Sequence, residues 1–342
     1  MKKIILTSLF LAVSLVMSAQ EEEKKFSISG SIDTYFRGNI SGGNYDTAPG
    51  SSFANQPGFA LGMINIIASY EGEKVGFVAD MVYGPRGADA VFGSQQTFTT
   101  TADGEVTVSG NNTIVNQLYA YWNVSDKVKL TIGNFNTFLG YEVISPTANF
   151  NYSTSYLFSY GPFSHSGIKA DFDLGGDTSL MLAVMNPTDA TDFNPNGSYA
   201  LGAQLGFSGQ FLNVLYDPAF FEIDYTGGFD LSEKFFLGIN AAYNSGNDGA
   251  PGFYGAALYP QLATSDSFKI GLRSEYFKED GAFGAIGAAG ADASVIATTL
   301  TGNYTIGSLT IIPELRLDTA SAGVFAGDKA LSSFVLAAVY SF

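Results

Sequence analysis

The sequence predicts an all-β fold, an antiparallel up-and-down β-barrel of about 16 strands that crosses a membrane. Three observations predict it: an N-terminal export signal, alternation of apolar and polar residues with a period of two, and connections that are alternately short and long. After the export signal, the chain has no run of about 18 or more mainly apolar residues, so a membrane-spanning helix is not expected.

The composition restricts the class of protein. Charged residues make up 14% of the 342 residues, against about 25% in an average soluble domain. The 32 acidic residues outnumber the 16 basic ones and give a net charge of −16, which argues against a nucleic acid partner. The chain has no cysteine, which excludes disulfides, thiolate metal sites and cysteine nucleophiles.

The N-terminus is typical of a cleaved export signal. Two lysines are followed by an apolar stretch and by the small residue Ala19. We therefore expect a signal peptide over residues 1–19, cleavage near Ala19 and Gln20, and a single barrel domain over residues 20–342. The expected location is the outer membrane of a Gram-negative bacterium.

The strand pattern is clearest in residues 26–37, 268–277 and 309–318. In each segment apolar residues share one face and polar residues share the other. Several such segments reach about ten residues, the length that a tilted strand needs to cross a bilayer.

Seven short turns alternate with eight longer links, which gives 16 strands with both chain ends on the short-turn side. The short turns lie near residues 71–74, 125–127, 175–177, 208–209, 232–234, 265–267 and 307–308. The longer links lie near residues 41–57, 84–113, 136–165, 187–198, 217–219, 245–252, 279–292 and 319–330. Because the strand pair around residues 216–221 is the least distinct, about 14 and about 18 strands remain as alternatives.

The last strand carries a further signal of the outer membrane. Alternate residues at the C-terminus are apolar or aromatic, and they end on Phe342. This series resembles the C-terminal signal that the barrel-assembly machinery reads. We therefore expect that machinery and outer-membrane lipid as partners.

A barrel of about 16 strands is too wide for wall side chains to fill, so it encloses a water-filled lumen. The expected function is a porin, a passive diffusion channel for small solutes or ions. The alternatives are a closed barrel with a structural or surface-adhesion role, and a substrate-selective channel. A homotrimer is expected by analogy with porins of this size.

The alternation also predicts which charged residues line the pore. Opposite charges on one face can set up a field across the pore, or they can pair and stiffen the wall. The expected pore-lining residues are Asp33, Arg37, Asp80, Lys129, Lys169, Asp171, Arg273, Glu275, Glu314, Arg316 and Asp318.

The link over residues 136–165 is far longer than the usual connection of about five residues, and long links are commonly functional. It is rich in aromatic residues, and Glu142 is its only carboxylate. We expect it to fold into the lumen as a constriction, the alternative being packing over the rim or against a neighbouring protomer. The expected constriction residues are Tyr141, Glu142, Tyr152, Tyr156 and His165.

No catalytic or metal-binding pattern is present, so no enzyme, metal or cofactor is expected. His165 is the single histidine, and no serine and acidic partner are spaced to form a triad with it. The segment from Asp192 to Gly197 resembles the start of a calcium-binding loop, but Ala203 stands where the bidentate glutamate should be.

Four segments together resemble the putative β-barrel porin-2 family of outer-membrane proteins. The likeness covers nearly the whole mature chain. It implies a barrel in the outer membrane and a porin function, and because the family has no catalytic motif, it implies no site residue. The segments are residues 53–59 (FANQPGF), 83–87 (YGPRG), 116–122 (NQLYAYW) and 133–142 (GNFNTFLGYE).

Overall fold

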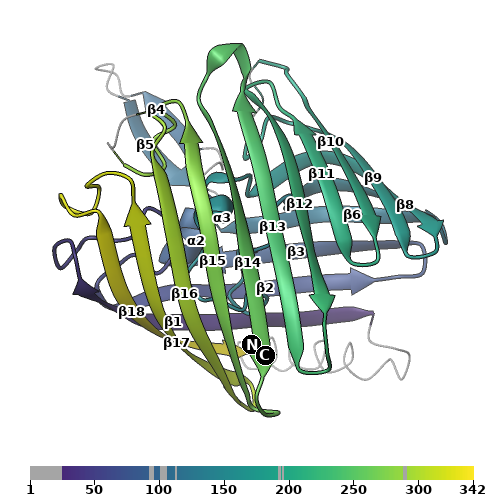
Figure 1. The fold of residues 1–342 in the computed structure, drawn as a ribbon. Helices are drawn as coiled ribbons and strands as arrows, with labels where there is room; N and C mark the ends of the chain where they lie inside the picture. Colours follow the sequence, from purple (N-terminus) through teal and green to yellow (C-terminus); the bar gives the residue numbers. More distant parts are fainter. Residues whose placement is uncertain are drawn as a thin grey trace, which may run out of the picture.

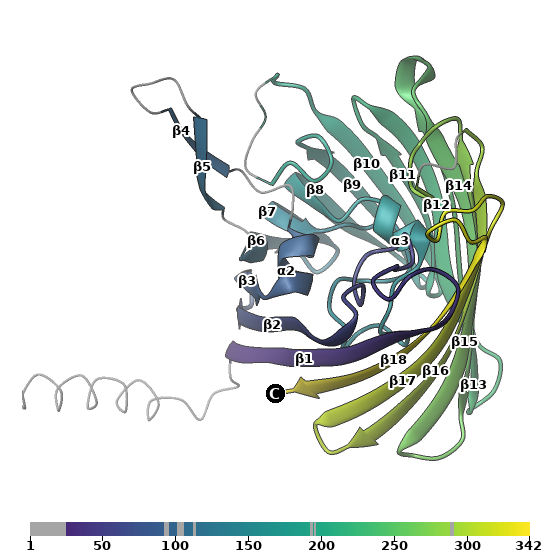
Figure 2. The same cartoon turned by 90° about the vertical axis from the view of Figure 1, so that its left-hand side faces the viewer.

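The computed structural model describes residues 25–91, 96–100, 106–111, 114–191, 194, 196–287 and 291–342. Within these residues, sixteen antiparallel strands close into one barrel (Figures 1 and 2). The 16-strand barrel predicted from the sequence is therefore confirmed. The predicted signal peptide and Asp192 lie outside the described residues.

The barrel strands follow one another around the wall in chain order. The strands of the first half are β1 (Phe26–Ser41), β2 (Gly58–Glu71), β3 (Val75–Tyr83), β6 (Val115–Ser125), β7 (Val128–Asn136), β8 (Ser164–Gly175), β9 (Thr178–Met185) and β10 (Ala200–Phe207). Those of the second half are β11 (Gln210–Tyr216), β12 (Phe220–Asp230), β13 (Phe235–Gly246), β14 (Gly252–Ala263), β15 (Phe268–Asp280), β16 (Ser294–Ile306), β17 (Leu309–Ala320) and β18 (Ala330–Ser341).

The first and last strands close the barrel. β1 pairs antiparallel with β18, for example Thr34 with Ala338. Gly30 and Phe342 also exchange two backbone hydrogen bonds of 3.0 Å, so the last residue of the chain is part of the closing ladder. Closure removes exposed sheet edges, which is what a strand-built membrane wall requires.

The short turns sit where the sequence placed them. Ser208 and Gly209 join β10 to β11 with φ values of 47° and 77°. Two consecutive residues with positive φ make a tight hairpin turn whose twist matches that of the flanking strands. Glycine and small polar residues adopt this conformation at least cost, which is why the turns were visible in the sequence.

The link over residues 84–113 is structured, which the sequence did not indicate. It contains helix α2 (Pro85–Ala90) and a separate hairpin of β4 (Gln96–Thr100) and β5 (Val106–Asn111). Pro85 sits in the first turn of α2, where a missing backbone N–H costs nothing. The hairpin projects away from the barrel wall (Figure 2).

Two further short helical segments lie in links. Helix α3 (Tyr156–Tyr160) belongs to the link between β7 and β8, and the 3-10 turn η1 (Asn247–Gly249) belongs to the link between β13 and β14. No helix in the described part of the chain is long and apolar enough to cross a membrane.

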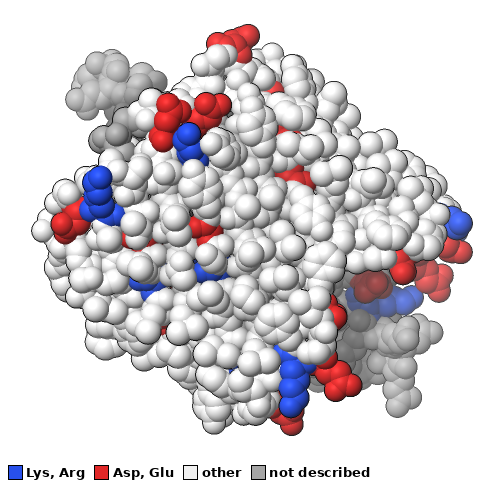
Figure 3. All heavy atoms as spheres, in the orientation of Figure 1, with Lys and Arg blue, Asp and Glu red and all other residues white. Residues whose placement is uncertain are grey.

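The two faces of each strand differ in composition. On β15, Leu272 is 37% exposed on the outer face while its neighbour Arg273 is fully buried inside. On β17, Leu315 is exposed between the buried residues Glu314 and Arg316. Figure 3 shows that most charged side chains on this side of the molecule lie near its edges. An outer face of this kind suits contact with lipid.

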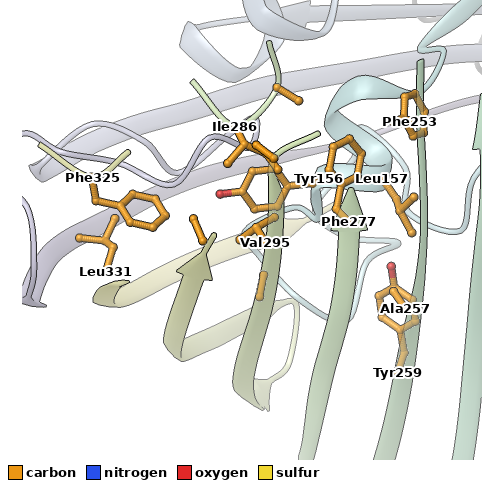
Figure 4. Close-up of a cluster of buried hydrophobic side chains, with 14 residues drawn as sticks. Tyr156, Leu157, Phe253, Ala257, Tyr259, Phe277, Ile286, Val295, Phe325 and Leu331 are labelled. Atoms are coloured by element: carbon orange, nitrogen blue, oxygen red, sulfur yellow. The ribbon is translucent and has the colours of Figure 1, made fainter. Parts of the chain in front are cut away.

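The buried apolar residues lie inside the barrel, between the inner wall and the long links. The largest cluster surrounds Tyr156 of α3 and includes Phe253 and Tyr259 of β14, Phe277 of β15 and Leu331 of β18 (Figure 4). The lumen is therefore partly filled by the chain itself.

Candidate functional site in the barrel lumen

The residues between β7 and β8, 137–163, form a segment that we name the lumen loop. It leaves the end of the barrel that carries the long links and enters the interior, where α3 lies between the walls (Figure 2). Its residues Pro146 and Phe150 line a cavity together with Asp266 of the short turn between β14 and β15. The lumen loop thus extends through the barrel to the end with the short turns.

All of the predicted pore-lining residues lie at inward-facing positions of their strands, but they differ in exposure. The residues that are at most 3% exposed are Asp33, Arg37, Asp80, Arg273, Glu275, Glu314, Arg316 and Asp318. Those that stay accessible are Lys129, Lys169 and Asp171. The buried set lies mostly under the lumen loop, as the contacts below show.

Two wall carboxylates hold the lumen loop by its backbone. Glu314 of β17 accepts hydrogen bonds from the N–H groups of residues 152 and 153, at 2.6 and 3.0 Å. Glu275 of β15 accepts from the N–H groups of residues 156 and 157, at 2.9 and 2.7 Å. Charge-assisted hydrogen bonds of this kind are roughly twice as strong as neutral ones, so both carboxylates fix the path of the loop.

Two wall arginines bind the same stretch. Arg273 donates to the carboxylate of Glu142 at 2.6 Å and to the carbonyl oxygens of residues 153–154 at 2.6 and 3.2 Å. Arg316 donates to the Thr154 carbonyl at 2.8 Å and makes a two-bond pair with Asp318, also at 2.8 Å. Both arginines therefore bind backbone carbonyls of the lumen loop, and their buried guanidinium groups do not face the open lumen.

The loop tyrosines are packed against the wall. The Tyr152 hydroxyl donates to Asp33 at 2.5 Å, and Tyr156 packs against the ring of Phe277 at 5.7 Å. Tyr141 stacks on Tyr259 with ring centres 4.2 Å apart, and burial raises the pKa of Tyr141 to about 12. These phenols are therefore neutral packing groups at physiological pH.

His165 belongs to β8 and not to the lumen loop, which ends at residue 163. The residue is fully buried and pairs across the sheet with Phe135. Its Nε2 lies 2.9 Å from the hydroxyl of Thr137, the first residue of the lumen loop. The expectation that His165 stands in the link therefore needs correction: Ser164 already begins the strand.

Arg86 in α2 is a site residue that the sequence analysis missed. Its guanidinium lies 4.2 Å from the ring centre of Phe53 and 5.1 Å from that of Tyr152. It also donates to the carbonyl oxygens of Ile144 and Tyr152, both at 3.1 Å. Arg86 thus joins three long links inside the barrel. The sequence feature that could have identified it is that Arg86 is the only basic residue in the link over residues 84–113.

The lumen loop leaves one part of the wall uncovered. We name it the open wall: the inner faces of β2, β3, β6, β7 and β8 toward the short turns. It bounds a cavity of about 420 Å³ whose lining includes Gln117, Tyr119, Tyr121, Lys129 and Lys169. A second cavity of about 770 Å³ at the short turns shares Asn123 and Lys129 with it.

Ion pairing on the open wall is sparse. Lys169 lies 3.3 Å from Asp171, and both side chains remain partly exposed. Asp80 accepts hydrogen bonds from Asn116 and Gln117, at 2.8 and 3.1 Å. The described residues contain no group of three or more acidic or histidine side chains placed to hold a metal ion.

Comparisons with known proteins agree with this architecture. A family model described as "Putative beta-barrel porin-2, OmpL-like" matches residues 25–342. No curated protein matches the sequence.

Several solved structures are similar in fold. The outer membrane channel DcaP of Acinetobacter baumannii is 14% identical, with a TM-score of 0.61 over 93% of this chain and 97% of that chain. OprB of Pseudomonas putida, in a high-pH structure, is 11% identical, with a TM-score of 0.62 over 93% and 94%. OmpT of Vibrio cholerae, in its trimer form, is 12% identical, with a TM-score of 0.53 over 93% and 99%. At these identities the likeness shows the fold alone.

Proposed function

The chain belongs to the putative beta-barrel porin-2, OmpL-like family and is an outer-membrane porin, and from this premise we propose that solutes cross the barrel along the open wall. The observation that carries the proposal is that the lumen loop leaves the open wall uncovered toward the short turns. Its buried carboxylate anchors on β1, β15 and β17 are Asp33, Glu275 and Glu314. Its first residues are held on β10 and β12, by Gln204 and Asp224. Two cavities, of about 420 and 770 Å³, lie against β6, β7 and β8. The cavity beside Phe150, against β15 to β18, is smaller, at about 230 Å³.

The lumen loop is the proposed constriction, with Tyr141, Glu142, Tyr152 and Tyr156 among its packed residues. A loop held by buried charge-assisted bonds keeps a fixed shape, so it sets the size of the passage. On the side of the long links, a cavity of about 500 Å³ lies among Ser51, Asn55, Asp89 and Tyr160. The proposed path leads from this cavity past the loop to the open wall.

We further propose a mild preference for cations. The cavity at the short turns is lined by more acidic than basic side chains: Glu73, Asp126, Asp171, Asp173 and Asp177 against Lys127 and Lys129. Rings of carboxylates at a pore mouth raise the local concentration of cations. The net charge of −16 acts in the same direction.

Single-channel recording tests the function. The purified mature protein in a planar bilayer is expected to give discrete open steps of the order of a nanosiemens. Heat-denatured protein from the same preparation is the control. A folded barrel that stays silent would support the alternative of a closed barrel with a structural or adhesive role.

Reversal potential in a salt gradient tests the preference for cations. The expected sign is that of a channel more permeable to K⁺ than to Cl⁻. An anion-selective reversal potential would contradict the role of the acidic mouth while leaving the channel function intact.

Three further features of the biogenesis and assembly are proposed. The export signal over residues 1–19 is removed near Ala19, and the C-terminal strand ending at Phe342 is read by the barrel-assembly machinery. A homotrimer is supported by the trimer form of the similar OmpT structure. Mass spectrometry of the mature N-terminus and light scattering in detergent test the first and last of these.

A further inference from the structure

Two lysines on neighbouring strands project from the open wall. In the β7–β8 ladder, Lys129 pairs with Asp171 and Thr131 pairs with Lys169. The two lysines therefore occupy diagonal positions on one face, within reach of each other's long side chains. Both line the same cavity of about 420 Å³.

These lysines differ from the arginines of the barrel interior. The described arginines are buried and bonded to loop carbonyls or carboxylates: Arg37, Arg86, Arg273 and Arg316. Among the described ion pairs, Lys169 has one partner, Asp171, and Lys129 has none within 4.0 Å. Lys129 is therefore an accessible ammonium group in the lumen without a direct ion pair, because the carboxylate of Asp171, its cross-strand neighbour, is paired with Lys169.

Aromatic rings flank both ammonium groups. Lys129 Nζ lies 5.7 Å from the centre of the Tyr121 ring, and Lys169 Nζ lies 5.5 Å from that of Phe135. The Tyr121 ring lies over Gly76 of β3, where an added Cβ would be only 2.3 Å from the ring. Gly76 thus leaves the space that the ring occupies, which fixes Tyr121 beside the lysines.

We propose that Lys129, Lys169 and Tyr121 form a binding step for small carboxylates that carry an aromatic ring. The ammonium groups would donate charge-assisted hydrogen bonds to the carboxylate, and the Tyr121 ring would pack against the ring of the solute. The inference rests on the proposed path along the open wall. It names the class of solute that this path retains.

The acidic mouth does not conflict with such a step. Bulk ion preference reflects the summed field of the whole passage, whereas retention of a carboxylate depends on the groups at one point. There the two ammonium groups outnumber the one adjacent carboxylate, that of Asp171. A passage can therefore favour K⁺ over Cl⁻ and still bind an aromatic carboxylate.

The test is block of the single-channel current by benzoate. Millimolar benzoate is expected to reduce the open-channel current of the wild-type protein in KCl. Acetate, which lacks the ring, should block less, and benzylammonium, which carries the opposite charge, should block least. In Lys129→Gln/Lys169→Gln, the concentration of benzoate for half block should rise about tenfold or more.

Two variants separate the binding step from general electrostatics. Lys269→Gln removes the same charge from another lumen cavity, beside Phe150 and Asn303, and should leave benzoate block unchanged. Tyr121→Leu should weaken block by benzoate and leave block by acetate unchanged. Two results would overturn the proposal: equal block by benzoate and benzylammonium, or a loss of benzoate block in Lys269→Gln as large as that in Lys129→Gln/Lys169→Gln.

Calorimetric titration of benzoate into the detergent-solubilised full chain distinguishes this inference from the proposed function. Saturable binding that Lys129→Gln weakens supports the binding step whether or not channels are recorded. Open channels without benzoate block or binding would refute the step alone.

Discussion

The guanidinium of Arg273, on β15, and the carboxylate of Glu142, in the lumen loop, lie 2.6 Å apart, and the side chains are 0% and 3% exposed. The two residues are 131 positions apart in the chain. A buried ion pair of this kind attaches the loop to the wall, and breaking it leaves a charge without compensation.

Replacing one partner of this pair should be costly. Arg273→Met is expected to lower the free energy of unfolding by about 3–5 kcal/mol, because Glu142 would stay buried without its partner. Urea unfolding in detergent, followed by the fluorescence of Trp122, the only tryptophan, measures this. The double variant Arg273→Met/Glu142→Gln should lose less unfolding free energy than Arg273→Met alone, because it leaves no unpaired charge. A double loss equal to the sum of the single losses would show that the pair is not coupled.

Shortening the lumen loop should widen the passage. Asn149 closes the loop tip through hydrogen bonds to the backbone N–H and carbonyl of Val143, at 2.8 and 2.5 Å. Residues 145–148 can therefore be replaced by two glycines, which keeps the buried Ile144 and its contact with Arg86 as well as the anchors at Glu275 and Glu314. Conductance should rise, by about twofold if this tip bounds the narrowest section. An unchanged or lower conductance would contradict the constriction.

The stack on Arg86 should stabilise the packed links. Arg86→Leu removes two hydrogen bonds from a charged donor and two ring contacts. The free energy of unfolding should therefore fall by about 2–4 kcal/mol. Open-channel noise should increase as the links loosen. Arg86→Lys keeps the charge but lacks the planar fork, so it should recover little of the loss. Full recovery by lysine would mean that charge alone matters.

Asp189 should make the stability of the barrel depend on pH. Its carboxylate accepts from the N–H groups of Phe163 and Ser164, both at 2.8 Å, where the lumen loop joins β8. Burial raises the pKa of Asp189 to about 6, above the value of about 3.9 in an unfolded chain. The native state then binds this proton more tightly, so stability should fall as pH rises from about 4 to about 6, by up to about 3 kcal/mol.

Asp189→Asn is the matched test. The amide oxygen can accept the same two N–H groups but does not ionise, so this component of the pH dependence should disappear. In urea unfolding at pH 4 and pH 7.5, the variant should have a higher free energy of unfolding than the wild-type protein only at pH 7.5. A higher free energy of unfolding at both pH values would point to a cause other than ionisation of Asp189.

Much of the fold could be predicted because its determinants are local. A residue in a strand faces the side opposite to its neighbours, so the polar face of residues 268–277 already indicated that Arg273 and Glu275 point inward. Turn residues such as Ser208 and Gly209 mark strand ends through their tolerance of positive φ. The bilayer determines which face of each strand points outward, because lipid requires an apolar outer surface.

The course of the lumen loop was decided by contacts between distant residues. Tyr152 reaches Asp33 across 119 positions, and nothing near either residue in the chain specifies that partner. The same holds for Arg86, whose contacts with Ile144 and Tyr152 come from another link.

The sequence alone therefore determined which side chains point into the barrel, because alternation along a strand fixes direction. Only the tertiary structure decided which of those side chains meet solvent. Arg273 lies beneath the lumen loop and Lys129 does not, and this follows from where a long segment settles on the wall once its backbone groups have found buried partners.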